Sequence, residues 1–332
     1  MQAWVVSGRP GTVGRVERAD LPVPRPGPDD LLVRVRTCGV CRTDLHLADL
    51  ELEPRAPRRV PGHEIVGEVA ELGSQVQGWR PGDRVGAAWL RSTCGTCRWC
   101  RSGRENLCRS SLYTGWDADG GFAEYAVVPA AFAYALPAGL PDEVVAPLLC
   151  SGIIGYRALH RAAVPAGGHL GLYGFGASAH LTAQVALATG VHVHAVSREA
   201  AARALALELG ADWAGDVGDE PPVPLDGAIL FAPVGEMVLP AMRALDQGAT
   251  LAIACIHLTD IPALDYQAHV FRERSLTSVT ANTRQDGHEL LALAVTLGLR
   301  PRVTTYDLDH TDHALQDLAS GRVTGAAVVR VG

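Results

Sequence analysis

The chain has 332 residues, 48% of them hydrophobic, and a formal charge of −7. That length exceeds the usual size of one domain and predicts two domains, each able to bury its own core. The negative charge disfavours a nucleic-acid or anionic-membrane surface, because such surfaces need a concentrated basic face. All 29 basic residues are arginine, and the lack of lysine excludes Schiff-base chemistry.

The N-terminal residues and the longest apolar runs indicate whether the protein is expected to be secreted or to span a membrane. The N-terminal residues lack a basic segment followed by a long apolar run, and no later stretch reaches eighteen uninterrupted apolar residues. We therefore expect neither secretion nor membrane spanning. A cytoplasmic protein that acts on small molecules, with no nucleic-acid or membrane partner, is predicted.

The first 150 residues contain short β-branched runs separated by glycine and proline. Strands are predicted at 31–36 and 65–70, with a turn at 81–86. This texture is typical of a small β-rich barrel with long loops. Residues 1–150 are therefore expected to form one domain.

From residue 151 onward, strand and helix patterns alternate. In chain order the predicted elements are a strand at 169–173, a helix at 177–189, a strand at 191–196, a helix at 198–209, a surface loop at 218–225 and strands at 226–231, 249–254 and 276–280. Such alternation predicts an α/β domain over 151–285, with a parallel sheet covered by helices on both faces. Residues 286–332, with a helix at 289–297 and a strand at 326–331, are expected to return to the first domain.

Four of the eight cysteines, Cys94, Cys97, Cys100 and Cys108, fall within one short stretch. Two-residue spacers let neighbouring sulfurs converge on one Zn²⁺ ion, and a site with four sulfur ligands has no open position for substrate. The stretch therefore predicts a structural zinc site. Two disulfides or a cluster of free thiols are the alternatives, which intracellular reduction disfavours.

A glycine-rich turn, Gly174 to Ala179, directly follows the predicted strand at 169–173 and opens the next helix. Two glycines allow a tight turn and close approach of a pyrophosphate to backbone N–H groups at a helix N-terminus. The motif is weak alone, and a plain glycine turn is the alternative, but its strand-turn-helix placement favours a dinucleotide site. The predicted cofactor-binding residues of this turn are Gly174, Gly176, Ala177 and Ser178.

The cofactor type is predicted from the end of the next strand, where an NAD site usually carries Asp or Glu for the ribose hydroxyls. Ser197 and Arg198 stand there instead. A cation in the first turn of a helix is electrostatically unfavourable unless an anion lies beside it, and a 2′-phosphate would be such an anion. NADP(H) is therefore favoured over NAD(H). The alternative makes Ser197 an ordinary N-cap and Arg198 a solvated residue.

Three other segments contain candidate metal ligands: Cys38 to His46, Gly62 to Glu64 and Ala146 to Cys150. Cysteine, histidine and cysteine would form a three-ligand zinc site with a fourth position open for water or a substrate oxygen. Spacing alone does not establish that such distant residues converge, and a lone cysteine or histidine is more often a core residue. Cys38 and Cys41 could also form a redox pair.

These motifs together resemble the zinc-dependent alcohol dehydrogenases of the medium-chain dehydrogenase/reductase superfamily. The resemblance runs over nearly the whole chain through the segments 39–46, 61–67, 94–108, 149–150 and the turn at 174. It implies a GroES-like catalytic domain closed by the C-terminal segment, a Rossmann domain between them, and a second, catalytic zinc in the cleft. It further implies Cys41, His63 and Cys150 as the ligands of that zinc, with Glu64 and Asp44 supporting.

The resemblance also implies the chemistry and its helpers. The catalytic zinc polarises an alcohol or carbonyl oxygen while hydride passes between the substrate carbon and the nicotinamide. Asp44 would orient the imidazole of His63. Thr43 and His46 match the family's relay from hydroxyl to imidazole, which carries the proton toward solvent. Without the resemblance, a packing residue and a surface histidine would be the expected readings.

Further positions match the family less specifically. Arg42 matches a pyrophosphate-binding position, for which a guanidinium suits bidentate phosphate contact. Trp89 matches an aromatic residue that narrows the substrate cleft, and Trp116 and Leu52 are weaker candidates for the same lining. Core packing is the alternative for all three. The chain departs from the pattern at two positions, Ile154 and Ala326, where some members carry threonine and arginine.

Two rival functions remain open on the sequence. The same scaffold could reduce C=N or activated C=C bonds, although the presence of Thr43 and His46 disfavours this. A zinc- and nucleotide-binding redox sensor without catalysis is the other, and the complete ligand set disfavours it. Relatives of this family are dimers or tetramers, so a homodimer or homotetramer is expected.

Overall fold

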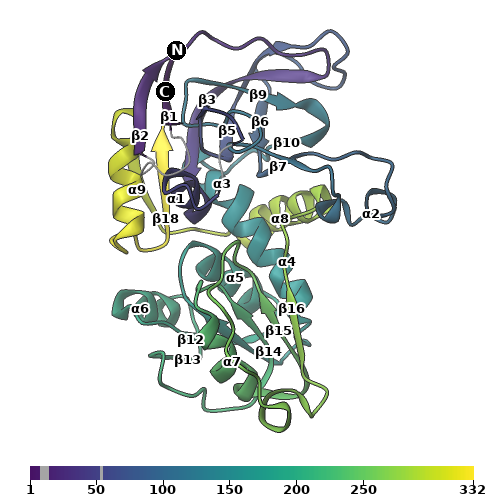
Figure 1. The fold of residues 1–332 in the computed structure, drawn as a ribbon, viewed down its shortest axis with the longest axis vertical. Coiled ribbons are helices and arrows are strands. Elements are labelled where there is room, and N and C mark those ends of the chain that lie inside the picture. Colours follow the sequence, from purple (N-terminus) through teal and green to yellow (C-terminus); the bar gives the residue numbers. More distant parts are fainter. Residues whose placement is uncertain (8–14, 53–54) are drawn as a thin grey trace. The chain divides into compact units, whose positions relative to one another are not determined.

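The structure is a computed structural model that describes residues 1–7, 15–52 and 55–332. The chain divides into two compact units (Figure 1). The first contains Met1–Cys150, Ala281–Val295 and Arg302–Gly332, and the second contains Ser151–Thr280 and Thr296–Pro301. Within the described residues, no helix is both long and apolar enough to span a bilayer.

A seven-stranded sheet forms the centre of the first unit. Its strand order is β10-β6-β5-β3-β18-β17, and β9 also pairs with β3. The strands are β3 (Asp30–Val40), β5 (Glu64–Leu72), β6 (Arg84–Ala87), β9 (Tyr125–Pro129), β10 (Ala133–Ala135), β17 (Val303–Asp307) and β18 (Ala326–Arg330). In β3, Val33 and Val35 are buried while Arg34 and Arg36 are exposed, which is the alternation of a strand with one face on a core. The C-terminal strand β18 pairs antiparallel with β3, so the end of the chain completes this sheet.

Two smaller sheets and several helices surround that centre. The first small sheet has the order β2-β1-β4, and the second pairs β7 with β8. These elements are β1 (Gln2–Ser7), β2 (Arg15–Asp20), β4 (Arg58–Arg59), β7 (Leu90–Ser92) and β8 (Leu112–Tyr113). The helices are α1 (Arg42–Ala48), α2 (Arg98–Arg101), α3 (Asp142–Pro147), α8 (Arg284–Leu297) and α9 (Thr311–Ala319), with short turns η1 (Glu105–Leu107), η2 (Ala130–Phe132), η3 (Leu148–Gly152) and η6 (Leu308–His310).

The second unit contains a six-stranded, fully parallel sheet of order β13-β12-β11-β14-β15-β16. Its strands are β11 (His169–Tyr173), β12 (His192–Val196), β13 (Trp213–Gly215), β14 (Leu225–Leu230), β15 (Leu245–Ile253) and β16 (Ser275–Ser278). Its helices are α4 (Ile153–Ala162), α5 (Ala177–Ala188), α6 (Ala200–Glu208) and α7 (Val238–Ala244), with η4 (Gly235–Met237) and η5 (Tyr266–Val270). One apolar cluster joins the sheet to α4, α5 and α6, and another joins it to η4 and α7. The predicted doubly wound α/β fold is confirmed.

Two predicted helix starts are wrong, and capping explains one of them. Helix α8 begins at Arg284, five residues before the predicted start at 289. Thr283 and Asp286 form a reciprocal cap, in which Thr283 N–H donates to Asp286 Oδ2 at 2.7 Å and Asp286 N–H donates to Thr283 Oγ1 at 3.2 Å. Helix α6 begins at Ala200 rather than at 198, with Glu199 at its N-cap.

Candidate functional site

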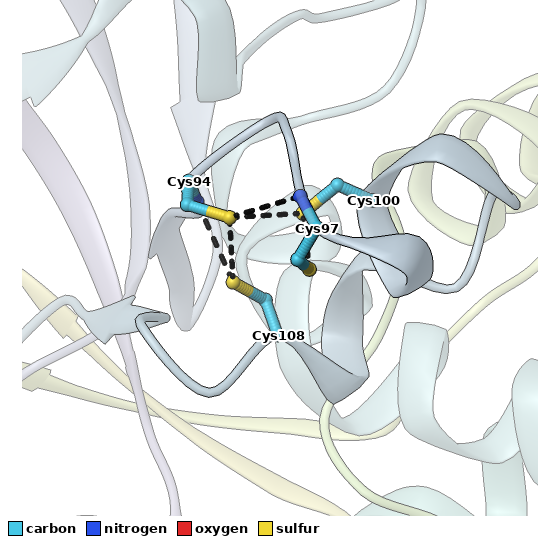
Figure 2. Close-up of side chains that lie close together, drawn as sticks. All are labelled: Cys94, Cys97, Cys100 and Cys108. Atoms are coloured by element: carbon cyan, nitrogen blue, oxygen red, sulfur yellow. Dashed lines mark hydrogen bonds between the residues drawn. The ribbon is translucent and has the colours of Figure 1, made fainter.

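Four cysteines converge in the loop that carries α2 and η1, between β7 and β8 (Figure 2). The sulfurs of Cys94, Cys97, Cys100 and Cys108 all lie within 4.8 Å of one another. Individual Sγ–Sγ distances are 3.5 Å for Cys97–Cys100, 3.6 Å for Cys94–Cys108 and 3.9 Å for Cys94–Cys100. A disulfide needs about 2.05 Å, so the alternative of two disulfides is wrong. Tetrahedral Zn²⁺ with bonds of about 2.3 Å separates its sulfurs by roughly 3.8 Å, which this cluster matches.

A partly buried ion pair joins the four-cysteine loop to helix α8 of the same unit. Glu105 Oε1 accepts hydrogen bonds from both the backbone N–H and Nε of Arg284 at 2.9 Å, and Oε2 accepts from Nη2 at 2.7 Å. These contacts to Arg284 hold the pKa of Glu105 below its usual value. The loop and the start of α8 are therefore positioned together.

A second group of possible ligands comes from three separate elements. Cys41 is the N-cap of α1, and Cys150 lies in η3. Glu64 is the first residue of β5, and His63 directly precedes it. Their ligand atoms all lie within 4.8 Å of one another, and the Cys41 and Cys150 sulfurs are 3.9 Å apart. The residues that sequence analysis grouped are thus brought together by the fold.

The donor set of this second group fits a zinc ion. His63 is fully buried, and its Nε2 has no hydrogen-bond partner among the described residues. Leaving a buried polar atom without a hydrogen-bond partner costs free energy. An unpaired Nε2 beside two thiols is therefore the arrangement expected of a histidine that binds a metal ion. The hydrogen bond between the two thiols lowers the pKa of Cys41 well below its ordinary value and raises that of Cys150. The pair therefore favours one thiolate, which is the form that binds a metal. Two sulfurs and an imidazole are ligands that Zn²⁺ prefers.

Asp44 organises this cluster from α1. Its Oδ2 accepts the backbone N–H of Cys41 at 2.9 Å, and its Oδ1 accepts that of Gly62 at 3.0 Å and lies 3.2 Å from His63 Nδ1. Burial alone would lower the pKa of His63, but Asp44 and Cys41 raise it well above its usual value. A carboxylate only accepts hydrogen bonds, so Asp44 keeps a proton on Nδ1 of His63. In the neutral ring, which is the form that binds a metal, Nε2 therefore carries the lone pair.

One close approach at this cluster requires glycine. Gly39 in β3 pairs with Glu64 in β5, and a Cβ at position 39 would overlap the Glu64 carboxylate. Any other residue there would displace the Glu64 side chain from the ligand cluster. The glycine therefore leaves the space that the buried carboxylate fills.

The predicted relay residues lie on α1, next to the cluster. Thr43 is buried, and its Oγ1 lies 3.8 Å from Cys41 Sγ. His46 is buried on the same short helix, and its Nδ1 contacts Glu51 Oε2. Arg42, predicted to bind pyrophosphate, is exposed at the first position of α1.

The predicted substrate-lining residues include a stack of aromatic rings beside His63. The Trp89 ring centroid lies 6.4 Å from that of His63, 4.1 Å from that of Tyr113 and 6.4 Å from that of Trp116. Leu52 is half-buried, and its backbone N–H donates to the carbonyl oxygen of His46 at 3.0 Å. All three predicted positions thus belong to the same unit as the second cysteine-histidine cluster.

In the second unit, the glycine turn has the geometry that a dinucleotide site needs. Gly174 follows β11 with φ +88°, and a Cβ there would lie 2.8 Å from the backbone nitrogen of Ala232. Gly176 is the N-cap of α5, and Ala177 and Ser178 form its first turn, so their backbone N–H groups stand at a helix N-terminus. The turn therefore offers the backbone donors that a pyrophosphate binds.

The structure of the segment after β12 differs from both interpretations of Ser197 and Arg198 that the sequence allowed. Glu199, not Ser197, is the N-cap of α6, so Arg198 precedes the helix instead of occupying its first turn. The Arg198 side chain is 84% exposed and pairs with Glu199 at 2.9 Å. Arg203 Nη1 donates to the carbonyl oxygens of Ser197 at 2.6 Å and of Arg198 at 2.9 Å. Two guanidinium groups thus lie at this turn, and each is paired with a carboxylate: Arg198 with Glu199, and Arg203 with Asp216 at 3.1 Å.

The chain was compared with known proteins. Residues 27–138 match the family described as "Alcohol dehydrogenase GroES-like domain". The whole chain aligns at 57% identity with 97% of "Probable alcohol dehydrogenase AdhA" from Mycobacterium tuberculosis (strain CDC 1551 / Oshkosh). The chain belongs to the zinc-containing medium-chain alcohol dehydrogenases.

Two solved structures extend the comparison to the full fold. A cinnamyl alcohol dehydrogenase from Sorghum bicolor superimposes with a TM-score of 0.90 at 27% identity, over 99% of this chain and 97% of that one. A zinc-binding dehydrogenase from Sinorhizobium meliloti 1021, solved with bound NADP, gives 0.87 at 29% identity, over 99% and 100%. This alcohol dehydrogenase interconverts alcohols with aldehydes or ketones, depends on zinc and uses a nicotinamide cofactor.

The family assignment and the structure together decide between the alternative functions that sequence analysis left open. A non-catalytic redox sensor and a reductase of C=N or C=C bonds are not the functions that the relatives support. The Cys38–Cys41 redox pair is also not what the structure shows. Cys38 is fully buried with its thiol 3.6 Å from the carbonyl oxygen of Gly39, whereas the sulfur of Cys41 faces that of Cys150.

Several residues of the alcohol dehydrogenase were not found from the sequence. Tyr113 stacks between the predicted tryptophans, Arg203 supports the turn after β12, and Glu51 contacts His46. The two departures from the family pattern are packing residues here: Ile154 lies against the apolar cluster of the second unit, and Ala326 is buried in β18.

Proposed function

We propose that Cys41, His63 and Cys150 hold the catalytic zinc of this dehydrogenase, with Asp44 orienting His63 and Glu64 closing the buried side of the site. The observation that carries this assignment is the buried, unpartnered Nε2 of His63 beside two sulfurs. The zinc, when bound, supplies Lewis acidity to the substrate oxygen during hydride transfer. We propose the four cysteines 94, 97, 100 and 108 as the structural zinc site.

Thr43 and His46 form the proposed proton relay of the site. The Thr43 hydroxyl lies against the ligand cluster, while His46 lies toward the end of the same helix, so α1 runs from the reacting centre outward. A relay is needed because the proton of an alcohol must leave a buried site when the alcohol is oxidised. Both residues act on the proton and neither binds the metal.

Replacing Thr43 by alanine tests the relay. We expect kcat for alcohol oxidation to fall about a hundredfold, since the group that first takes the proton is removed. Thr43→Ser, which keeps the hydroxyl, should stay within about threefold of wild type, and both variants should retain two zinc ions per chain. Unchanged turnover in Thr43→Ala would remove Thr43 from the mechanism.

NADP(H) is the proposed cofactor, bound by Gly174, Gly176, Ala177 and Ser178 at the pyrophosphate and by Ser197 and Arg198 at the 2′-phosphate. Arg42 is proposed as a further pyrophosphate ligand. The exposed Arg198–Glu199 pair is weak and can reopen when a phosphate offers a better partner. The NADP-bound relative from Sinorhizobium meliloti supports this preference.

Cofactor preference is tested by steady-state kinetics with both nucleotides. Wild-type enzyme should show a lower KM for NADPH than for NADH, and Arg198→Ala should raise the KM for NADPH about tenfold while leaving that for NADH within about twofold. Arg272→Ala, which removes another exposed arginine of the same unit, is the matched control. A clear NADH preference in the wild type would overturn the assignment.

The remaining proposals concern substrate, assembly and location. Trp89, Trp116 and Leu52 are proposed to line the substrate pocket for a small alcohol, aldehyde or ketone. Residues 1–150 and 286–332 are proposed as the catalytic domain and 151–285 as the nucleotide domain.

A cytoplasmic location is proposed because both zinc sites need reduced thiolates. A homodimer or homotetramer is proposed because β16 lies at an edge of its sheet, where a second copy could pair with it. Sedimentation of the purified enzyme as a monomer would contradict the assembly.

A further inference from the structure

The chain reverses direction immediately after α1. Asp49 caps the helix, and Leu50 adopts φ +57°, a left-handed conformation that residues other than glycine, asparagine and aspartate seldom adopt. The backbone N–H of Leu52 then donates to the carbonyl oxygen of His46 at 3.0 Å. The segment after the helix is therefore folded back along its last turn and fixed there by a backbone hydrogen bond.

This reversal places a carboxylate on the relay histidine. Glu51 Oε2 contacts Nδ1 of His46. The His46 side chain is 10% exposed, whereas that of Glu51 is 53% exposed, so the pair links a buried imidazole to solvent. A carboxylate can only accept, so this contact keeps the proton on Nδ1 and leaves Nε2 as the ring nitrogen that takes up a proton.

We propose that Glu51 is a positioning residue of the proton relay, which fixes the tautomer and orientation of His46. The proposal rests on the proposed relay role of His46. An O–H bond of the relay breaks and an N–H bond forms at Nε2. Glu51 retains the proton on Nδ1, and the N–H bond at Nε2 then breaks as that proton passes to water. No electrons are exchanged in this step, and the starting ring is restored.

Two other carboxylates near this helix, Asp44 and Asp317, are engaged elsewhere. Asp44 accepts from His63, Cys41 and Gly62 at the ligand cluster. Helix α9 packs against α1, and its Asp317 accepts from the Tyr306 hydroxyl at 2.8 Å and pairs with Arg322. Glu51 is the carboxylate that the turn after α1 brings into contact with His46. It does not belong to the ligand cluster of Cys41, His63 and Cys150.

The experiment compares Glu51→Ala and Glu51→Gln in the zinc-loaded enzyme. We expect kcat for alcohol oxidation to fall about tenfold in Glu51→Ala with substrate KM within about twofold, because orientation of the base is lost while binding is kept. Glu51→Gln, which keeps an acceptor oxygen without the charge, should lie between. Asp49→Ala removes an exposed carboxylate from the same turn and should stay within about twofold of wild type.

A spectroscopic measurement separates positioning from a merely structural role. In enzyme with ¹⁵N-labelled histidine, the His46 signals, assigned by their loss in His46→Gln, should show Nδ1–H in the wild type. In Glu51→Ala they should show a mixture of the two tautomers. Retention of the wild-type kcat and of the pure Nδ1–H form in Glu51→Ala would overturn the proposal.

The double variant distinguishes failure of this inference from failure of the relay. If His46→Gln leaves kcat unchanged, His46 is not in the relay and the proposed function is wrong at that residue. If His46→Gln lowers kcat but Glu51→Ala does not, only the role of Glu51 is wrong. Glu51→Ala should have no further effect on kcat in the His46→Gln background, and an additional tenfold loss there would show that Glu51 does not act through His46.

Discussion

The His63→Asn variant should contain one zinc ion per chain in place of two and should lose alcohol oxidation by at least about a thousandfold. Asparagine keeps an N–H donor near the position of Nδ1, which faces Asp44 at 3.2 Å, but it has no atom at the position of Nε2. The substitution therefore removes the ligand while Asp44, which is fully buried, retains a partner. Elemental analysis and initial rates with a primary and a secondary alcohol measure the two effects.

A neighbouring thiol provides the control for this variant. Cys38 is fully buried in β3, close to the ligand cluster, but its sulfur contacts the carbonyl oxygen of Gly39. Cys38→Ala should therefore retain two zinc ions and most of the activity. If His63→Asn kept two zinc ions and wild-type rates, the three-ligand site would be wrong. If Cys38→Ala lost one ion, the choice of Cys41 over Cys38 would be wrong.

The two zinc sites differ in how far the sequence alone could predict them. Cys94, Cys97, Cys100 and Cys108 are close in sequence, so short spacers already bring their sulfurs together. Cys150 lies far along the chain from His63, and its approach to Cys41 depends on how η3 lies against the sheet of the first unit. Local patterns carry no information on such an approach, and only the resemblance to a family supplied it.

The turns after α1 and β12 have conformations that the local sequence did not predict. No glycine marks the left-handed residue after α1, so nothing in the sequence indicates that Leu50 reverses the chain and returns Glu51 to His46. After β12, Ser197 is a better N-cap by preference than Glu199, yet Glu199 caps α6. The backbone contacts of Arg203 with this turn fix its geometry, and they form only in the folded unit.

The positions of the central strands of the parallel sheet, in contrast, were predicted from local sequence patterns. The predicted strands at 169–173 and 226–231 correspond to β11 and β14, which are central strands of the sheet with most of their residues buried. The start of α8 was missed although Thr283 and Asp286 have the spacing of a capping pair. That signal was present in the sequence, since it depends on two side chains and one helix turn.

Replacing Cys108 by serine should remove the structural zinc and lower the melting temperature by roughly 10 °C. Loss of a bound metal is one of the changes that can cost about 4 kcal/mol of stability, and about 1 kcal/mol lowers the melting temperature by roughly 2–4 °C in larger domains. Cys108 is the buried member of its cluster, so serine would also leave a hydroxyl where a metal–sulfur bond was. The Glu105–Arg284 pair would still join the loop to its unit.

Cys108→Ser should lower the thermal stability of the enzyme without lowering its catalytic rate. None of the four cysteines belongs to the cluster of Cys41, His63 and Cys150, so Cys108→Ser should retain one zinc ion. Its rate at a temperature well below unfolding should stay within about threefold of wild type. Cys255→Ser, which changes a thiol outside both clusters, should leave the zinc content and the melting temperature unchanged. A Cys108→Ser enzyme that lost its activity at low temperature while keeping two zinc ions would contradict the division into one structural and one catalytic site, because the four-sulfur site would then contribute to the reaction itself.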